Sequence, residues 1–113
     1  PKSRFVAEFV GTANVLSGCH SKALGYQGTV MVRPEMIGLG AGGVGDTSVT
    51  GTVHEKQYFG SFWRLQAAIN HTTLALTVDI AAASAQPVPD VGQTTVLHWP
   101  AHAVHSIADI ATA

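Results

Sequence analysis

The most constraining feature of this sequence is the alternation of apolar and polar residues along its central third. Leu74, Leu76, Val78 and Ile80 alternate with small or polar residues, and a strict period of two is typical of a half-buried strand. Residues Phe62–Ile69 alternate in the same way. Because such strands are stable only when paired, the sequence predicts a mainly β fold.

Turn residues separate the runs that we expect to form strands. Val49–Phe59 and Phe62–Ile69 flank Gly60-Ser61, which predicts a β-hairpin. Thr29–Val32 and Thr95–Trp99 are further short strands. With the run ending at Ile80, about five short strands indicate a small OB-like β-barrel. No helical period returns after residue 14.

The first residues have a different pattern. Within Pro1–Val10, an apolar stripe including Phe5 and Phe9 predicts a short amphipathic helix, which needs a surface to dock on. We therefore expect residues 1–12 to be a terminal helix and linker, and residues 13–113 to be the β-barrel domain. Because the chain starts with proline instead of methionine, we expect it to be a fragment of a larger protein.

Composition excludes several classes of protein. The 113 residues are 46% hydrophobic and 12% charged, with a net charge of −1, which argues for a globular domain and against nucleic-acid binding. The one cysteine cannot form an internal disulfide. No apolar run approaches about 20 residues, so no membrane-spanning helix is expected.

The stretch GAGGVGDT, Gly40 to Thr47, is one letter from the phosphate-binding loop pattern, with Asp46 in place of the lysine. Such a loop needs a cation and a following helix. Here the acidic residue reverses the charge, and the residues that follow have the period of a strand. We interpret the stretch as a connection between strands, not as a nucleotide site.

Other polar groups offer little chemistry. His98, His102 and His105 lie close in sequence, but Trp99-Pro100 interrupts regular geometry between the first and the others, so a metal site is not expected. Cys19 and His20 are adjacent, and their side chains need not meet. No acid and base have a spacing that argues for catalysis, so enzyme activity within this chain is not expected.

Aromatic residues cluster at the expected hairpin: Tyr58, Phe59, Phe62 and Trp63, with Arg64 beside them. On an open barrel such residues can stack on bases or sugars. The alternative is that some rings are buried and the others form a protein interface. The low net charge favours the interface, so these five residues are the candidate interface residues.

Four stretches occur in the order found in one family: FVAEFVGTANVLSG, VMVRPEMIGL, GDTSVTGTVHEKQYFGSFWRLQAAI and PDVGQTTVLHWPAHAVHSI. Together they resemble the C-terminal region of ABC importer ATP-binding subunits of the spermidine/putrescine and iron(III) type. This region is the transport-associated OB domain, or TOBE-like domain, preceded by the last helix of the nucleotide-binding domain. The turn residues that match the family are Arg33, Pro34, Glu35, Gly60 and Trp99. His102 stands where an acidic residue is usual.

The resemblance implies a non-catalytic accessory and regulatory domain that helps two ATPase subunits to dimerise. ATP and magnesium would bind only in the absent nucleotide-binding domain, and this chain itself is expected to hold no cofactor or metal. The implied partners are that domain, a second copy, and membrane permease subunits, at the cytoplasmic face of a prokaryotic membrane. The alternatives are a stand-alone module that binds a small anion or metal, and an OB-type nucleic-acid binder.

The segment Cys19–Gly28 is shorter than the family pattern. Either the barrel is trimmed here or the sequence is joined across missing residues. A trimmed barrel leaves an open sheet edge, which strand exchange with a second copy would close.

Overall fold

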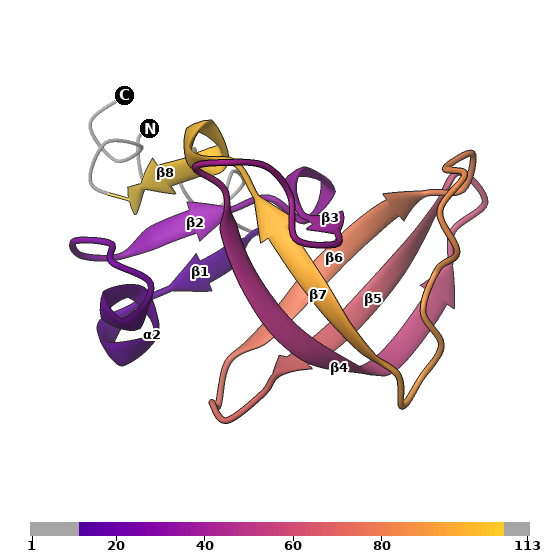
Figure 1. Ribbon diagram of the computed structural model, residues 1–113, viewed down its shortest axis with the longest axis horizontal. Coiled ribbons are helices and arrows are strands. Elements are labelled where there is room, and N and C mark those ends of the chain that lie inside the picture. Colours follow the sequence, from indigo (N-terminus) through magenta and orange to yellow (C-terminus); the bar gives the residue numbers. More distant parts are fainter. Residues whose placement is uncertain (1–11, 108–113) are drawn as a thin grey trace.

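The computed structural model describes residues 12–107, which form two antiparallel sheets (Figure 1). The larger sheet has the strand order β3-β7-β4-β5-β6. Its strands are β3 (Gly38–Leu39), β4 (Thr47–Tyr58), β5 (Phe62–Ile69), β6 (Ala75–Ala81) and β7 (Thr94–Trp99). The smaller sheet has the order β1-β2-β8, from β1 (Asn14–Leu16), β2 (Val30–Val32) and β8 (Val104–Ser106). The predicted mainly β fold is confirmed, although the smaller sheet was not anticipated as a separate unit.

The larger sheet curls into a half-barrel (Figure 1). Strands β4 and β5 pair from Gly51 opposite Ile69 to Tyr58 opposite Trp63, and their register shifts at His54, between Val53 and Glu55. A β-bulge of this kind bends the strand and increases its twist. The bulge therefore contributes to the curl, and it reverses which residues of β4 face inward beyond His54.

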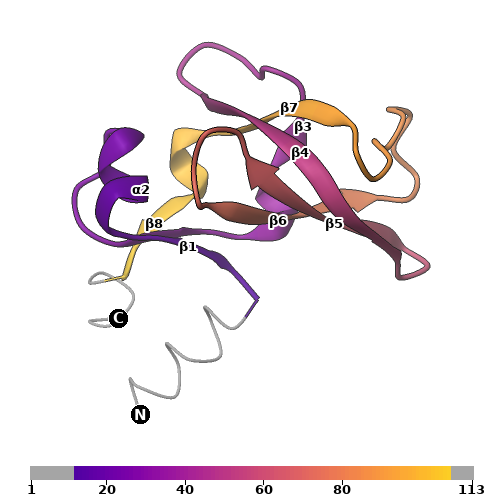
Figure 2. The same cartoon turned by 90° about the horizontal axis from the view of Figure 1, so that it is seen from below.

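The smaller sheet lies beside one end of the half-barrel (Figure 2), and the short helix α2 (Gly18–Ala23) lies on its β1 side (Figure 1). The sequence showed no helical period after residue 14, so this helix was not anticipated, because six residues make too few turns to show such a period. The segment Cys19–Gly28 links β1 to β2 through this helix, and β1 and β2 pair within one chain. Ser21 is buried, and its hydroxyl donates to the Gly28 carbonyl.

The core lies where the two sheets meet. Leu16 and Val32 from the smaller sheet belong to the same cluster of buried side chains as Leu65 and Leu97 from the larger one. Trp99 is fully buried, and its indole Nε1 donates to the Tyr26 hydroxyl at 3.0 Å. Burial of this apolar surface is the main source of stability in a domain of this size.

Asn14 joins the two sheets by hydrogen bonds. Its amide nitrogen donates to the Thr77 carbonyl at 2.8 Å, and its amide oxygen accepts from the Thr77 N–H at 2.7 Å. Thr77 lies in β6, at the edge of the larger sheet. The Asn14 side chain thus replaces a neighbouring strand at this point of the edge. Two turns of 3₁₀ helix complete the fold: η1 (Pro34–Met36), which packs on β6, and η2 (Ala101–Ala103).

The predicted helix Pro1–Val10 lies outside the described residues, so the helix and the boundary near residue 12 stay predictions. Between residues 12 and 107, no helix has the length and apolar character needed to cross a bilayer.

Candidate functional site

The β4–β5 hairpin carries the candidate interface residues at its tip. Gly60 has a φ of 88°, in the left-handed region that glycine adopts without strain. The Phe59 N–H donates to the Phe62 carbonyl at 2.9 Å, and the Tyr58 hydroxyl donates to the Gly60 carbonyl at 2.7 Å. These bonds fix a tight turn, so the predicted hairpin at Gly60-Ser61 is confirmed.

The structure divides the candidate residues between two faces of the hairpin. Tyr58 and Trp63 lie on the inner face, with ring centroids 4.7 Å apart and planes tilted by 45°. Phe59 and Phe62 stack on the outer face, 5.0 Å apart and 9° from parallel. The Arg64 guanidinium lies over both phenyl rings, at 5.3 and 5.4 Å from their centroids.

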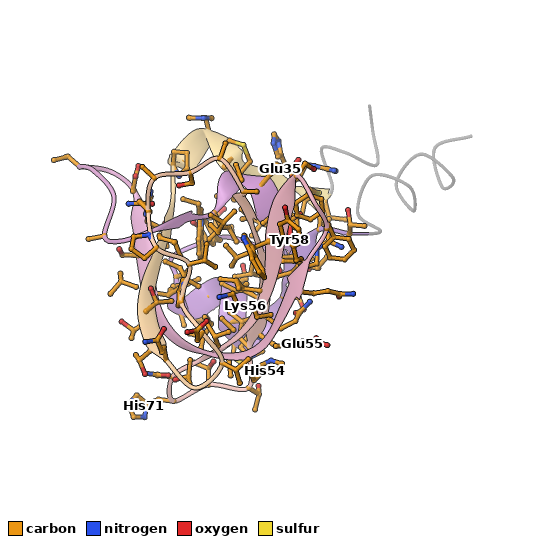
Figure 3. The ribbon with its side chains drawn as sticks, turned by 90° about the vertical axis from the view of Figure 1, so that its right-hand side faces the viewer. Glu35, His54, Glu55, Lys56, Tyr58 and His71 are labelled. Carbon is orange, nitrogen blue, oxygen red and sulfur yellow. The ribbon has the colours of Figure 1, made fainter. Side chains whose placement is uncertain are left out.

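We call Lys56, Tyr58 and Trp63 the inner cluster. The Lys56 ammonium lies 4.8 Å from the centroid of the Trp63 ring and 2.6 Å from an Asp90 carboxylate oxygen. A cation over an aromatic face is stabilised electrostatically. Figure 3 shows Lys56 and Tyr58 over the interior of the curled sheet. Because Asp90 belongs to the connection between β6 and β7, this connection is tied to the inner face of the hairpin.

We call Phe59, Phe62 and Arg64 the outer cluster. Arg64 donates two hydrogen bonds to the Asp79 carboxylate, from Nε at 2.8 Å and from Nη2 at 2.9 Å. Arg64 and Asp79 lie opposite each other on β5 and β6. A bidentate pair of this kind fixes the plane of the guanidinium. Asp79 therefore determines how Arg64 lies over the two phenyl rings.

The ion pair between Arg33 and Glu35 lies next to the pair of Arg64 and Asp79. Arg33 donates from Nε to Glu35 at 3.0 Å. Together with Arg64 and Asp79, these residues line a surface depression of about 440 Å³, to which Phe62 also contributes. Among the described residues that line the depression, two side chains are therefore cationic and two are anionic.

The charges in this depression act on one another. The hydrogen bonds to Asp79 raise the pKa of the Arg64 guanidinium, against a smaller opposing effect of desolvation. Burial alone would raise the pKa of Glu35, but backbone hydrogen bonding, the contact with Arg33 and the charge of Arg64 together lower it below its ordinary value. Glu35 therefore carries its negative charge at neutral pH.

The family-motif turn residues have structural positions. Pro34 is buried at the first position of η1, where its missing N–H is tolerated, and Arg33 and Glu35 flank it. Gly60 supplies the left-handed turn residue of the hairpin, and Trp99 fills the core. Of this set, Arg33 and Glu35 are brought close to the outer cluster.

The glycine-rich stretch connects β3 to β4, as expected for an inter-strand loop. Asp46 accepts a hydrogen bond from the Gly43 N–H at 3.1 Å, which closes the loop on itself. Gly42 has a φ of 74°, and a Cβ there would meet Asp46 at 2.5 Å and the His98 ring at 2.7 Å. The glycine at this position is therefore explained by close packing and does not require a phosphate.

The histidines do not converge. The His98 ring bonds to the Gly40 carbonyl at 2.8 Å, whereas His102 and His105 are exposed on η2 and β8. His20 bonds to the Thr73 hydroxyl at 2.9 Å, and its neighbour Cys19 is exposed. Within residues 12–107, no three histidine, cysteine or acidic side chains form a set that could hold a metal ion.

The ion pairs of Arg64 with Asp79 and of Lys56 with Asp90 were not predicted from the sequence, and neither was that of Arg33 with Glu35. The pairing of Arg64 with Asp79 could have been predicted from the sequence. A short connection between the runs 62–69 and 74–80 places residues 64 and 79 opposite each other on neighbouring strands. The pairing of Lys56 with Asp90 could not have been predicted in this way, since it depends on the β-bulge and on the path of the loop between β6 and β7.

Comparisons with known proteins extend these observations. The profile of the TOBE domain family matches residues 30–107. The chain is 33% identical over 103 residues to the uncharacterized ABC transporter ATP-binding protein YdcT of Escherichia coli (strain K12). The matched region is 88% of this chain but only 30% of the length of that relative. In fold it is similar to the cytoplasmic molybdate-binding protein ModG, solved with molybdate bound. The TM-score is 0.58, with 16% identity, over 74% of this chain and 66% of ModG.

Proposed function

The chain belongs to the TOBE domain family and is similar in sequence to an ABC transporter ATP-binding protein, and on this premise we propose that it is a non-catalytic accessory domain of the ATP-binding subunit of an ABC importer. It assists the dimerisation of two such subunits and tunes solute uptake. ATP and magnesium bind in the nucleotide-binding domain of the parent subunit. That domain, a second subunit and the membrane permease are its partners, at the cytoplasmic face of the membrane.

The observation that carries this proposal is the aromatic tip of the β4–β5 hairpin. Tyr58 is 56% exposed and Phe59 is 45% exposed. Aromatic side chains are enriched at protein interfaces, where they contribute much of the binding energy. A hairpin that presents such rings to solvent fits a domain that works by contact with another protein.

Regulation in this proposal is a difference in binding. If the domain contacts its partner subunit more favourably in one state of the ATPase dimer, it shifts the population toward that state. Coupling free energies between sites are typically about 1–3 kcal/mol. An accessory domain can therefore change transport activity several-fold without taking part in hydrolysis.

The test compares the ATP-binding subunit with and without residues 13–113. We expect the shortened subunit to keep ATP binding but to dimerise more weakly, as measured by sedimentation equilibrium with and without ATP. Hydrolysis rates measured in parallel report whether the ATPase domain stays intact. Equal dimerisation of the two proteins, with ATP binding retained, would reject the proposal.

Binding of a small anion is the alternative, because the structurally similar ModG is a molybdate-binding protein. The charges argue against it here, since Arg33 and Arg64 are each paired with a carboxylate. Arginines whose charges are already balanced by carboxylates attract a dianion weakly. Titration calorimetry of this chain with molybdate tests the alternative, and saturable binding at micromolar concentration would favour it over assembly.

A further inference from the structure

We propose that the charged depression beside the hairpin binds a small zwitterion, a molecule with one carboxylate and one ammonium group, such as a free amino acid. In this site Arg64 binds the carboxylate and Glu35 binds the ammonium group. The inference rests on the proposed tuning of solute uptake, and it deepens that role by naming the class of molecule that the domain senses.

The depression has the size and the lining of a small-molecule site. Its volume of about 440 Å³ lies within the range of about 300–1,000 Å³ that is typical of such sites. Two residues with hydroxyl groups and two apolar residues line it beside the four charged side chains: Thr12, Ser61, Phe62 and Ala81. A few polar groups that converge beside apolar surface can fix the orientation of a ligand.

Arg64 has hydrogen-bond donors to spare although it is ion-paired. A guanidinium has five N–H donors, and the Asp79 carboxylate takes one from Nε and one from Nη2. Within residues 12–107, Arg64 makes no other hydrogen bond. The remaining donors on Nη1 and Nη2 form the end of the guanidinium, which can bind a second carboxylate in bidentate geometry. Because Arg64 lines the depression and its side chain is 28% exposed, a ligand can reach this group.

Glu35 supplies the negative charge that an ammonium group needs. Its side chain is 54% exposed, and Oε2 accepts a hydrogen bond from Arg33 Nε at 3.0 Å. An ionised carboxylate has about four lone-pair sites. Glu35 can therefore accept from the ammonium group of a ligand and still keep its contact with Arg33.

The balance of charges in the depression selects a zwitterion over a simple ion. Two of the described lining side chains are cationic and two are anionic. A simple anion is repelled by the two carboxylates, and a simple cation is repelled by the two guanidinium groups. A zwitterion avoids both penalties, because each of its charged ends lies next to a group of the opposite sign.

The site adjoins the aromatic tip of the hairpin. Arg64 lies over the rings of Phe59 and Phe62, and Phe62 itself lines the depression. A ligand on Arg64 therefore contacts the group that packs on the exposed ring of Phe59. Ligand binding is thus placed beside the surface that we propose for contact with another subunit.

The first experiment searches for the zwitterion with this chain. The standard amino acids, β-alanine and longer ω-amino acids are added one at a time to the isotope-labelled chain, and backbone amide shifts are followed by NMR. For at least one of them, we expect saturable shifts in residues 33–35, 61–64 and 79–81, with a dissociation constant below about 1 mM.

The second experiment removes one charge at a time from the amino acid that binds best. If that amino acid is leucine, isocaproate lacks the ammonium group and isoamylamine lacks the carboxylate. By titration calorimetry, we expect each analogue to bind at least about 10-fold more weakly than the amino acid, because each loses a charged hydrogen-bonding group.

Substitutions in the chain distinguish a binding role from a structural one. Glu35→Gln removes the charge but keeps the size of the side chain, so we expect the amino acid to bind about 10-fold more weakly and the carboxylate analogue at least as tightly as before. Arg64→Lys removes the donor fork, so both ligands should bind about 10-fold more weakly. Glu55→Gln is the matched control, since Glu55 is exposed and lies outside the depression, and it should change neither affinity.

Several results would overturn the inference. No saturable binding of any of these amino acids up to about 10 mM removes the site. A carboxylate analogue that binds as tightly as the amino acid shows that the depression recognises an acid and not a zwitterion. Equal effects of Glu35→Gln and Glu55→Gln, or shifts confined to residues outside the depression, place the ligand elsewhere. None of these results bears on dimerisation, which the comparison of subunits with and without residues 13–113 decides separately.

Discussion

Replacement of Asn14 by aspartate tests how the two sheets are held together. The two side chains have nearly the same shape, but ionised aspartate can only accept hydrogen bonds. In Asn14→Asp, one carboxylate oxygen still accepts from the Thr77 N–H. The other replaces the amide nitrogen that donates to the Thr77 carbonyl at 2.8 Å, so two oxygen acceptors face each other.

The size of the effect follows from the burial of this contact. Asn14 is only 6% exposed, so water cannot easily replace the missing donor. A buried carbonyl left without a partner costs about 1–3 kcal/mol, and a poorly compensated buried charge adds to this. We therefore expect Asn14→Asp to lower the free energy of unfolding by about 2–4 kcal/mol at neutral pH.

Acid should reverse part of this loss. A protonated aspartic acid has an O–H that can donate to the Thr77 carbonyl, as the amide does. Burial and the facing carbonyl raise the pKa of this carboxyl in the folded state above its unfolded value of about 3.9. The destabilisation is therefore small below about pH 3.9 and grows as the pH rises through the folded pKa.

Urea unfolding of the natural chain and of Asn14→Asp between about pH 3 and pH 7 measures this difference. Asn70→Asp is the matched control, because Asn70 is exposed and its Oδ1 accepts from the Thr52 hydroxyl at 3.1 Å, a role that a carboxylate keeps. We expect this control to change stability by less than about 0.5 kcal/mol. If the two variants are equally stable at every pH, the bridging role of Asn14 is refuted.

Two further predictions concern the core and the charged depression. Leu76 is fully buried, so Leu76→Ala should lower the free energy of unfolding by about 2–5 kcal/mol in urea titrations, and a loss below about 1 kcal/mol would contradict its place in the core. The pKa of Glu35 is lowered in the folded state from its ordinary 4.5, so at acid pH the unfolded state binds a proton more readily than the folded state does. The stability that ionised Glu35 contributes is therefore present above pH 4.5 and lost as the pH falls below it. Glu35→Gln should therefore lose less stability on acidification than the natural chain, and equal losses in urea unfolding on both sides of that pH would contradict this account.

The strands of the larger sheet could largely be predicted from the sequence. The run Phe62–Ile69 coincides with β5, and the run ending at Ile80 lies within one residue of β6 at each end. These strands have one buried and one exposed face, and their side chains therefore alternate visibly. Strands β1 and β8 have three residues each, too few for alternation to distinguish them from loops.

The candidate site was predicted in part. The aromatic residues were found because they are adjacent in sequence and flank a turn. The alternation along residues 62–69 placed Phe62 and Trp63 on opposite sides of a strand, but the sequence did not indicate that Tyr58 joins Trp63. The position of Phe59 beyond the end of β4 joins it to Phe62, a result of the turn geometry.

The sequence by itself determined the mainly β character, the hairpin at Gly60 and the role of the glycine-rich stretch as a connection between strands. These features depend on neighbouring residues, through side-chain alternation, backbone sterics and local charge. The tertiary structure alone decided the pairing of Asn14 with Thr77, which are 63 residues apart, and of Lys56 with Asp90. Such contacts depend on the bulge at His54 and on the packing of two sheets, because only the complete fold brings distant polar groups within hydrogen-bonding distance.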